Sequence, residues 1–226
     1  MKKRFTLSLE GVLLSPLHIS GPGEGLPLVD RCIQVDHRGV PLIPASSLRG
    51  RVRAHLERLA RSFGHPICTP PRPELTCPHN PSVPPPCLVC RIFGNNWMRS
   101  SVSFTDMTPI SYPKGPPPPW HRTGVGISRY TGTVREERLF VTQALPAEGM
   151  VFQGEIEGEL EEEELGWLIA ACRTVNHIGG EKARGMGRIE LKVKSLLIAY
   201  PEGEREENWE RFVRIAIEKE VEGDRT

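Results

Sequence analysis

The segment from Asn176 to Arg188 concentrates glycines and arginines in a pattern suited to binding a polynucleotide backbone. Its four glycines allow positive backbone dihedrals and a close approach of phosphates to main-chain N–H groups, while arginines supply charge-assisted hydrogen bonds. The spacing matches neither a Walker loop nor a dinucleotide fingerprint. A glycine-capped helix end at Gly179 is the structural alternative. The residues predicted to contact RNA here are Gly179, Gly180, Arg184, Gly185 and Arg188.

A second candidate anion site is the predicted start of a helix at Ser46. Free N–H groups in a first helical turn attract anions, and the hydroxyls of Ser46 and Ser47 add hydrogen-bonding capacity. Arg49, Arg51 and Arg53 follow closely. The alternative is an ordinary solvated basic face.

Four cysteines, Cys68, Cys77, Cys87 and Cys90, fall in a proline-rich stretch that has no hydrophobic periodicity. Four thiolates in such a segment are the ligands of a closed structural Zn²⁺ site, where the metal supplies folding energy that a core cannot. His65 or His79 could replace one cysteine. Free or disulfide-bonded cysteines are the alternative reading, and the chain shows no secretory signal that would favour disulfides.

Asp30 and Asp36 follow a glycine-rich loop that is predicted to be exposed. An aspartate held near RNA could position a divalent cation or assist attack by a 2′-hydroxyl on its own phosphodiester. Spacing alone favours a solvated turn residue instead. No catalytic triad, His-Glu-x-x-His pattern or pair of catalytic carboxylates occurs elsewhere in the sequence.

The composition describes one globular chain that is long enough to bury a core. It has 226 residues, of which 38% are hydrophobic and 25% charged, and a formal net charge of +1. Basic residues gather at 49–61 and 184–188, and acidic residues at 155–164 and 202–207, which predicts a basic face opposite an acidic one. Without a predicted targeting or membrane-spanning segment, the expected location is the cytoplasm.

Hydrophobic periodicity predicts an α+β fold that positions these residues. Strands are predicted at 5–14, 101–110, 151–160 and 189–194, and helices at 46–63, 165–175 and 209–216. The order of strand, helix, strand, strand, helix, strand is that of a ferredoxin-like fold, which RNA-recognition modules also use. Prolines interrupt this plan twice, in an insertion within 64–90 and in an extended arm and long hairpin within 113–140.

In combination, His18–Gly21, Pro41–Gly50, Cys87–Gly94 and the 179–188 loop resemble the RAMP superfamily of CRISPR-associated proteins, which act in antiviral defence. In detail, the chain resembles the repeated backbone subunit of type III effector complexes. The resemblance implies one ferredoxin-like domain over 1–226, with a zinc-binding lid at 64–97 and a thumb hairpin at 113–140.

In that family the subunit binds a guide RNA together with other RAMP subunits and further copies of itself, and each thumb wedges into the guide–target RNA duplex. The resemblance therefore implies roles for particular residues. Those implied to bind RNA are His18, Ser46, Ser47, Arg49, Arg53, Arg122, Arg129, Gly179, Gly180, Arg184, Gly185 and Arg188.

Catalytic members of the family carry an aspartate six residues before a second one, as Asp30 precedes Asp36. This implies that Asp30 takes part in endoribonuclease cleavage of target RNA with a divalent cation, expected to be Mg²⁺. Two alternatives remain open. One is a structural or capping subunit that binds guide RNA without cutting, and the other is a stand-alone protein that processes guide RNA.

Overall fold

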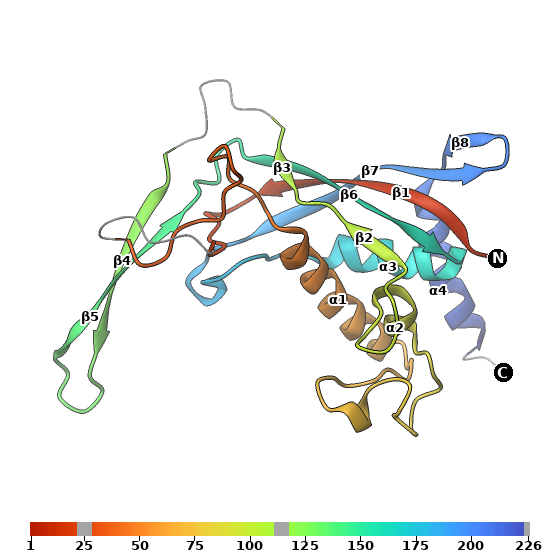
Figure 1. Ribbon diagram of the computed structural model, residues 1–226, viewed down its shortest axis with the longest axis horizontal. Helices are drawn as coiled ribbons and strands as arrows, with labels where there is room; N and C mark the ends of the chain where they lie inside the picture. The colour runs from red at the N-terminus through yellow and green to blue at the C-terminus, as the bar shows by residue number, and fades with distance from the viewer. Residues whose placement is uncertain (22–28, 111–117, 224–226) are drawn as a thin grey trace.

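Strands that alternate apolar and polar residues form one large antiparallel sheet, and the helices lie beneath it in Figure 1. The computed structural model describes residues 1–21, 29–110 and 118–223. Its strands are β1 (Lys3–Leu13), β2 (Val102–Phe104), β3 (Thr108–Pro109), β4 (Trp120–Ile127), β5 (Val134–Ala144), β6 (Val151–Leu160), β7 (Ile189–Tyr200) and β8 (Gly203–Glu206). Its α-helices are α1 (Ala45–Ser62), α2 (Leu88–Phe93), α3 (Glu162–Thr174) and α4 (Trp209–Gly223).

The sheet has the strand order β2-β6-β1-β7-β8, with β3 also paired to β6. Strand β1 lies between β6 and β7 and runs antiparallel to both. Helix α1 lies between β1 and β2 in the sequence, and α3 lies between β6 and β7, so each of these connections passes over one intervening strand. This interleaving of two βαβ units agrees with the ferredoxin-like order that the sequence predicts.

The core lies between the sheet and the helices beneath it. Leu7 and Leu9 of β1 are fully buried, as are Val52 and Leu56 of α1 and, from α3, nearly all of Trp167. Burying a leucine side chain contributes about 2 kcal/mol. Side chains at every second position of β1 thus anchor the helices, which hold the loops at the ends of the sheet in place.

The opposite face of the sheet is acidic where β6 crosses it. Glu155, Glu157 and Glu159 alternate with the buried residues of β6, while Thr6 and Ser8 of β1 lie on the same outer face. Along β1 and β6, both described over their full length, this face carries no aromatic side chain. RNA-recognition modules stack bases on aromatic residues of the sheet, and this surface offers neither the rings nor the charge for that mode.

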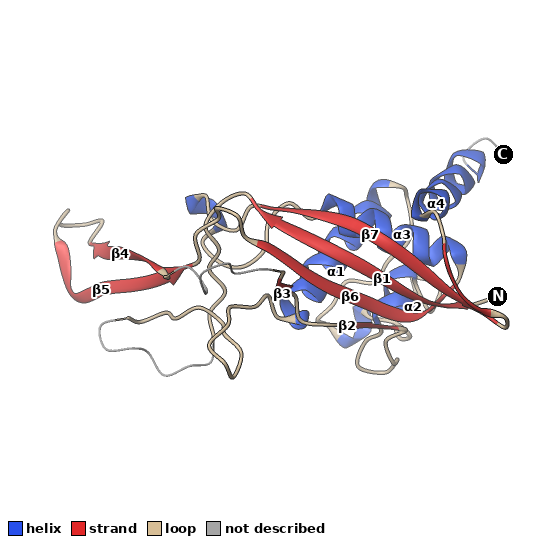
Figure 2. Cartoon of the chain, turned by 90° about the horizontal axis from the view of Figure 1, so that it is seen from above, coloured by secondary structure: helices blue, strands red, loops and turns tan. Residues whose placement is uncertain are grey.

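Strands β4 and β5 form a separate two-stranded hairpin that projects away from the sheet (Figures 1 and 2). The hairpin predicted within 113–140 is therefore present, although its second strand continues to Ala144 and residues 113–117 lie outside the described part. Val125, Ile127 and Leu139 are 46%, 61% and 62% exposed. A lone hairpin is marginally stable in water, so the contacts at its base are important.

The strand predicted at 101–110 is in fact two short strands, β2 and β3. Between them the chain leaves the edge of the sheet, and Met107 exchanges backbone hydrogen bonds with Ile43 at 2.9 and 3.0 Å. This detour also brings the Asp106 carboxylate to the backbone N–H of Ala45, 2.7 Å away. Asp106 therefore caps α1 from outside the helix, whereas the sequence suggested a cap within residues 44–47.

Candidate nucleic-acid interface and metal site

The glycine-rich loop at 179–188 has a defined fold that requires its glycines. Gly179, Gly185 and Gly187 have φ angles of 80°, 85° and 76°, where side chains with a Cβ are strained. A Cβ at Gly187 would overlap the carbonyl oxygen of Ile178, and the amide of Ile178 donates to the carbonyl of Gly187 over 2.8 Å. Because α3 ends at Thr174, Gly179 is not a helix cap, which excludes the structural alternative.

His18 connects this loop to the base of the hairpin. Its backbone carbonyl accepts a hydrogen bond from Gly180 at 2.8 Å, and its Nδ1 lies 2.6 Å from the carbonyl oxygen of Gln143. Its Nε2 lies 2.9 Å from the hydroxyl of Ser20, and the residue is only 3% exposed. Since both ring nitrogens are engaged within the chain, the His18 side chain positions the loop and the hairpin.

Acidic and basic side chains of the loop partly neutralise each other. Glu181 lies 2.6 Å from Arg184 and 3.3 Å from Arg31, while both guanidinium groups lie over the ring of Phe140 at about 6 Å. Glu181 adopts a left-handed φ of 55°, which is unusual for a residue with a side chain. The exposed Arg188 follows at the start of β7.

One face of α1 adds basic side chains beside the loop. The Arg51 Nε donates to the carbonyl of His177 at 2.8 Å, which attaches the helix to the loop. Arg51, His55 and Arg58 follow at the spacing of one helical face, and their charges and that of Lys182 are close enough to influence one another. No carboxylate in the described parts of the chain forms an ion pair with Arg51, Arg58 or Lys182.

The positive charges around His55 change its protonation. Burial, followed by the charges of Arg58, Arg51 and Lys182, lowers the pKa of His55 to about 4. The ring is therefore neutral at physiological pH. The sequence-based prediction did not include His55, Arg58 or Lys182, although the helical spacing from Arg51 was a signal that could have identified the first two.

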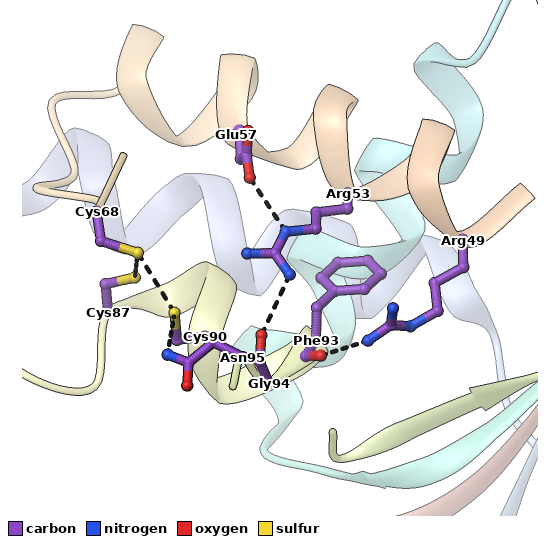
Figure 3. Close-up of polar contacts among 9 residues, drawn as sticks. All are labelled: Arg49, Arg53, Glu57, Cys68, Cys87, Cys90, Phe93, Gly94 and Asn95. Atoms are coloured by element: carbon purple, nitrogen blue, oxygen red, sulfur yellow. Dashed lines mark hydrogen bonds and ion pairs between the residues drawn. The ribbon is translucent and has the colours of Figure 1, made fainter. Parts of the chain in front are cut away.

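Arg49 and Arg53, which were predicted to bind RNA, lie on the other side of α1 (Figure 3). Arg49 donates to the carbonyl of Phe93 and Arg53 to that of Gly94, at the C-terminal end of α2. Arg53 also pairs with Glu57 at 3.1 Å. Cations suit the negative end of a helix, and these two arginines fasten α2 to α1.

At the N-terminal end of α1, Ser46 is exposed and Ser47 half-buried, and neither caps the helix. The Asp106 carboxylate already occupies the position where an anion was expected.

In the hairpin, Arg122 lies on β4 opposite Thr142, and the exposed Arg129 lies in the turn after β4.

Asp30 lies at the base of the hairpin, where its exposed carboxylate accepts a hydrogen bond from the Val141 amide at 2.7 Å. The Asp30 amide donates back to the Val141 carbonyl at 3.1 Å. Asp36 is a turn residue, since its carboxylate accepts hydrogen bonds from the backbone amides of Val40 and Arg38. These hydrogen bonds, that from Val40 first, hold the pKa of the Asp36 carboxyl below its usual value. The two aspartates have separate surroundings, and Asp30 is the one that faces the hairpin.

The four predicted cysteines form a compact buried cluster within residues 64–97. All four sulfur atoms lie within 4.8 Å of one another, with Cys68 at 3.4 Å from Cys90 and 3.7 Å from Cys87. A tetrahedron with Zn–S bonds of about 2.3 Å has edges of roughly 3.8 Å, which these separations approach. The cluster could therefore hold a metal ion such as zinc.

Neither of the alternative histidine ligands belongs to the cluster. His65 lies edge-on to Trp167 at 5.1 Å, and His79 lies edge-on to Trp97 at 4.9 Å. The amide of Asn95 donates to the Cys90 sulfur at 3.3 Å and to the Cys77 carbonyl at 2.9 Å. In the described residues no other group of three or more His, Cys, Asp or Glu side chains could hold a metal.

Hydrogen bonds between the cysteines shift their pKa values in opposite directions. The hydrogen bond between Cys90 and Cys87 lowers the pKa of Cys87 and raises that of Cys90, while burial raises the pKa of Cys77. A metal cation would displace the remaining protons, because metal ligation requires thiolates. This donor set fits a structural metal site.

The fold and these sites define a mixed α/β protein with a basic loop region and a tetracysteine cluster. The sequence matches the model of the RAMP superfamily over residues 12–190, from β1 to the start of β7. The chain therefore belongs to the RAMP superfamily, as its resemblance predicted. Proteins of this family bind CRISPR RNA, act in multi-subunit complexes and have ferredoxin-like folds. No curated protein matches the chain.

Family membership supports a CRISPR-associated RNA-binding subunit. None of the helices in the described ranges is both long enough and apolar enough to span a bilayer. The positive charge that RNA binding requires is found on the glycine-rich loop and the adjacent face of α1, and not on the acidic face of the sheet.

Proposed function

We propose that this chain is a backbone subunit of a type III CRISPR ribonucleoprotein that binds guide RNA without sequence preference. The observation that carries the proposal is the convergence of four segments at one end of the sheet. Hydrogen bonds link His18 to Gly180 and Gln143, and Arg51 to His177. The first loop, the basic face of α1, the glycine-rich loop and the hairpin base are thereby joined.

Such a surface suits recognition of the sugar-phosphate backbone. Arginine and lysine contacts to phosphates fix the position of a protein on RNA but carry no sequence information. Exposed Arg184 and Arg188 and the open backbone at Gly185 would contact phosphates directly. His18 and Gly179 would act indirectly, by holding the loop in shape.

The two insertions would have separate roles in the assembled complex. Residues 64–97 would form a lid with one structural Zn²⁺ bound by Cys68, Cys77, Cys87 and Cys90, and Arg49 and Arg53 would hold it against α1. The β4–β5 hairpin would be the thumb, and its exposed apolar residues together with Arg122 and Arg129 would enter the guide–target duplex. Neighbouring copies of the chain and other RAMP subunits would continue the filament.

RNA binding can be measured with the purified chain and a mixed-sequence single-stranded RNA. We expect binding at about 50 mM salt that weakens steeply as salt is added, because phosphate contacts release counterions. The double variant Arg184→Ala/Arg188→Ala should bind about tenfold more weakly, whereas Lys192→Ala on β7 should bind normally. A chain that ignores RNA at low salt would overturn the proposal.

Within this complex, we propose that Asp30 assists cleavage of target RNA with a divalent cation, expected to be Mg²⁺. Its carboxylate is exposed at the junction of the glycine-rich loop and the hairpin, where target RNA would pass. The second candidate, a structural subunit that does not cut, is favoured by a different observation. One oxygen of Asp30 already accepts the Val141 amide, and the described residues supply no neighbouring cluster of carboxylates.

Asp30→Asn separates these two functions in the assembled complex, because the amide oxygen retains the hydrogen bond from Val141 but the charge that binds a cation is lost. We expect Asp30→Asn to abolish cutting opposite this subunit while guide binding persists. Asp36→Asn, in a turn outside the site, should cut normally. Full cutting by Asp30→Asn would exclude the proposed role of Asp30 in cleavage. Cleavage of precursor RNA by the isolated chain would instead favour guide processing.

A further inference from the structure

Four side chains beside the glycine-rich loop form a basic cluster that pairs with no carboxylate in the described part of the chain. Arg51, His55 and Arg58 come from α1, and Lys182 comes from the loop. Burial and the neighbouring positive charges disfavour the charged forms of Arg51, His55 and Lys182. Like charges gathered without an acidic partner destabilise the folded chain unless an anion lies among them.

The buried ring of His55 has one engaged nitrogen and one without a partner. The Thr174 hydroxyl donates to the carbonyl of Ala171 at 2.8 Å, so its oxygen is an acceptor for His55 Nδ1 at 3.1 Å. The proton of the neutral ring therefore lies on Nδ1. The Nε2 is a buried acceptor with no hydrogen-bond partner among the described residues, although His55 is only 8% exposed.

We propose that Arg51, Arg58 and Lys182 form a subsite for one phosphate of the RNA backbone, and that His55 couples occupation of this subsite to uptake of a proton. The inference rests on the proposed RNA-binding function and adds a particular contact to it. Without the phosphate, three cations and no carboxylate of the described residues act on His55. Among the described residues, the neutral Thr174 of α3 is the side chain that forms a hydrogen bond with its ring.

A phosphate would reverse the electrostatics around His55. Its negative charge offsets the three cations and raises the pKa of the ring from about 4 toward the ordinary value of 6.5. The RNA-bound chain then holds more protons than the free chain, so acidification favours binding. Affinity should be flat above about pH 6.5 and should rise as pH falls from about 6.5 toward 4, between the pKa values of the bound and the free ring, with a slope of at most one order of magnitude per pH unit.

Fluorescence anisotropy with a mixed-sequence single-stranded RNA tests the subsite. Arg58→Ala and Lys182→Ala should each weaken binding about tenfold and reduce the salt slope by about 0.7, the value for one phosphate contact on a single strand. Lys192→Ala, on the outer face of β7, is the matched control. If the unchanged chain binds RNA but both variants bind equally well, the subsite is wrong and the proposed function survives. If the unchanged chain does not bind, the proposed function fails first.

Proton uptake is measured on the unaltered chain by calorimetry of RNA binding in two buffers of different ionisation enthalpy. At about pH 5.5 we expect net uptake of a fraction of one proton, because this pH lies between the pKa of the free ring and the upper limit for the bound ring, and zero uptake there would overturn the coupling. His55→Gln should abolish the pH dependence of affinity, whereas His37→Gln, in an exposed turn, should retain it. A pH dependence unchanged in folded His55→Gln would assign the proton to another group.

Discussion

Helix α1 carries basic side chains on two opposite faces, and the two sets have different surroundings. On the face toward the cysteine cluster, Arg49 and Arg53 are hydrogen-bonded to carbonyls at the end of α2. On the face toward the glycine-rich loop, Arg51 and Arg58 have no carboxylate partner among the described residues. Arginines two positions apart in the sequence therefore have internal carbonyl partners on one side and no carboxylate partner among the described residues on the other.

The comparison shows that the partners of a charge, and not its presence, indicate function. The cysteine side is satisfied internally, because its arginines bind carbonyls and its sulfurs lie against one another. The loop side has an excess of positive charge that no carboxylate of the described residues neutralises through an ion pair. The following predictions test this contrast.

Removing metal should produce the largest effect, and only on the cysteine side. Metal binding contributes about 10–16 kcal/mol in small zinc domains, so a chelator or Cys87→Ser should unfold residues 64–97 and lower the melting temperature. Limited proteolysis would detect new cleavage in that segment. Cys32→Ser, outside the cluster, is the control. Chelated protein that keeps its melting temperature and protease resistance would argue against a structural metal.

Substituting a glycine on the loop side should have the next largest effect. Gly187→Ala is strained by its positive φ and by overlap with Ile178, so we expect a loss on the order of 3 kcal/mol. Gly185→Ala shares the positive φ but points into open space, and should cost only about 1 kcal/mol. Urea unfolding measures both values. Equal losses would mean that the close approach to Ile178 is unimportant.

Substitutions on the two faces of α1 should affect different properties, the free energy of unfolding on one face and the RNA affinity on the other. Arg49→Ala loses the bond to Phe93 and its stacking on that ring, so we expect a stability loss of about 1–2 kcal/mol with unchanged RNA affinity. Arg58→Ala relieves repulsion and should leave the free energy of unfolding unchanged or slightly higher while RNA affinity falls. Denaturation and anisotropy on both variants decide this, and the contrast fails if they behave alike.

The smallest effect concerns the end of α1 that both faces share. Asp106→Ala removes the acceptor for the Ala45 amide and should cost about 1 kcal/mol. Asp106→Asn retains an acceptor oxygen and should cost much less. Thermal denaturation compares the two variants, and equal melting temperatures for Asp106→Ala and the unaltered chain would exclude the cap.

Much of the fold follows from local sequence patterns. Alternation predicted β6 with its observed limits, and helical spacing predicted α1 and α3. The four cysteines were also identified correctly as one cluster, since four cysteines in a segment without hydrophobic periodicity are typical of a structural metal site. These features depend on residues that are near one another in the chain.

Features that depend on tertiary neighbours were not predictable. Asp106 became the helix cap because the chain leaves the sheet to pair with Ile43, which no local pattern indicates. His18 was expected to face RNA, yet its ring is buried against Gln143. Arg49 and Arg51 look equivalent in the sequence, and only the position of α2 distinguishes them.

His18 has a mechanical consequence for the molecule. Its carbonyl holds Gly180 and its ring holds Gln143, so the loop and the hairpin base share one rigid joint. Because Gln143 belongs to β5, one residue fixes both the loop and the strand that leads into the hairpin. The loop and the hairpin therefore share a common anchor on the first loop of the chain.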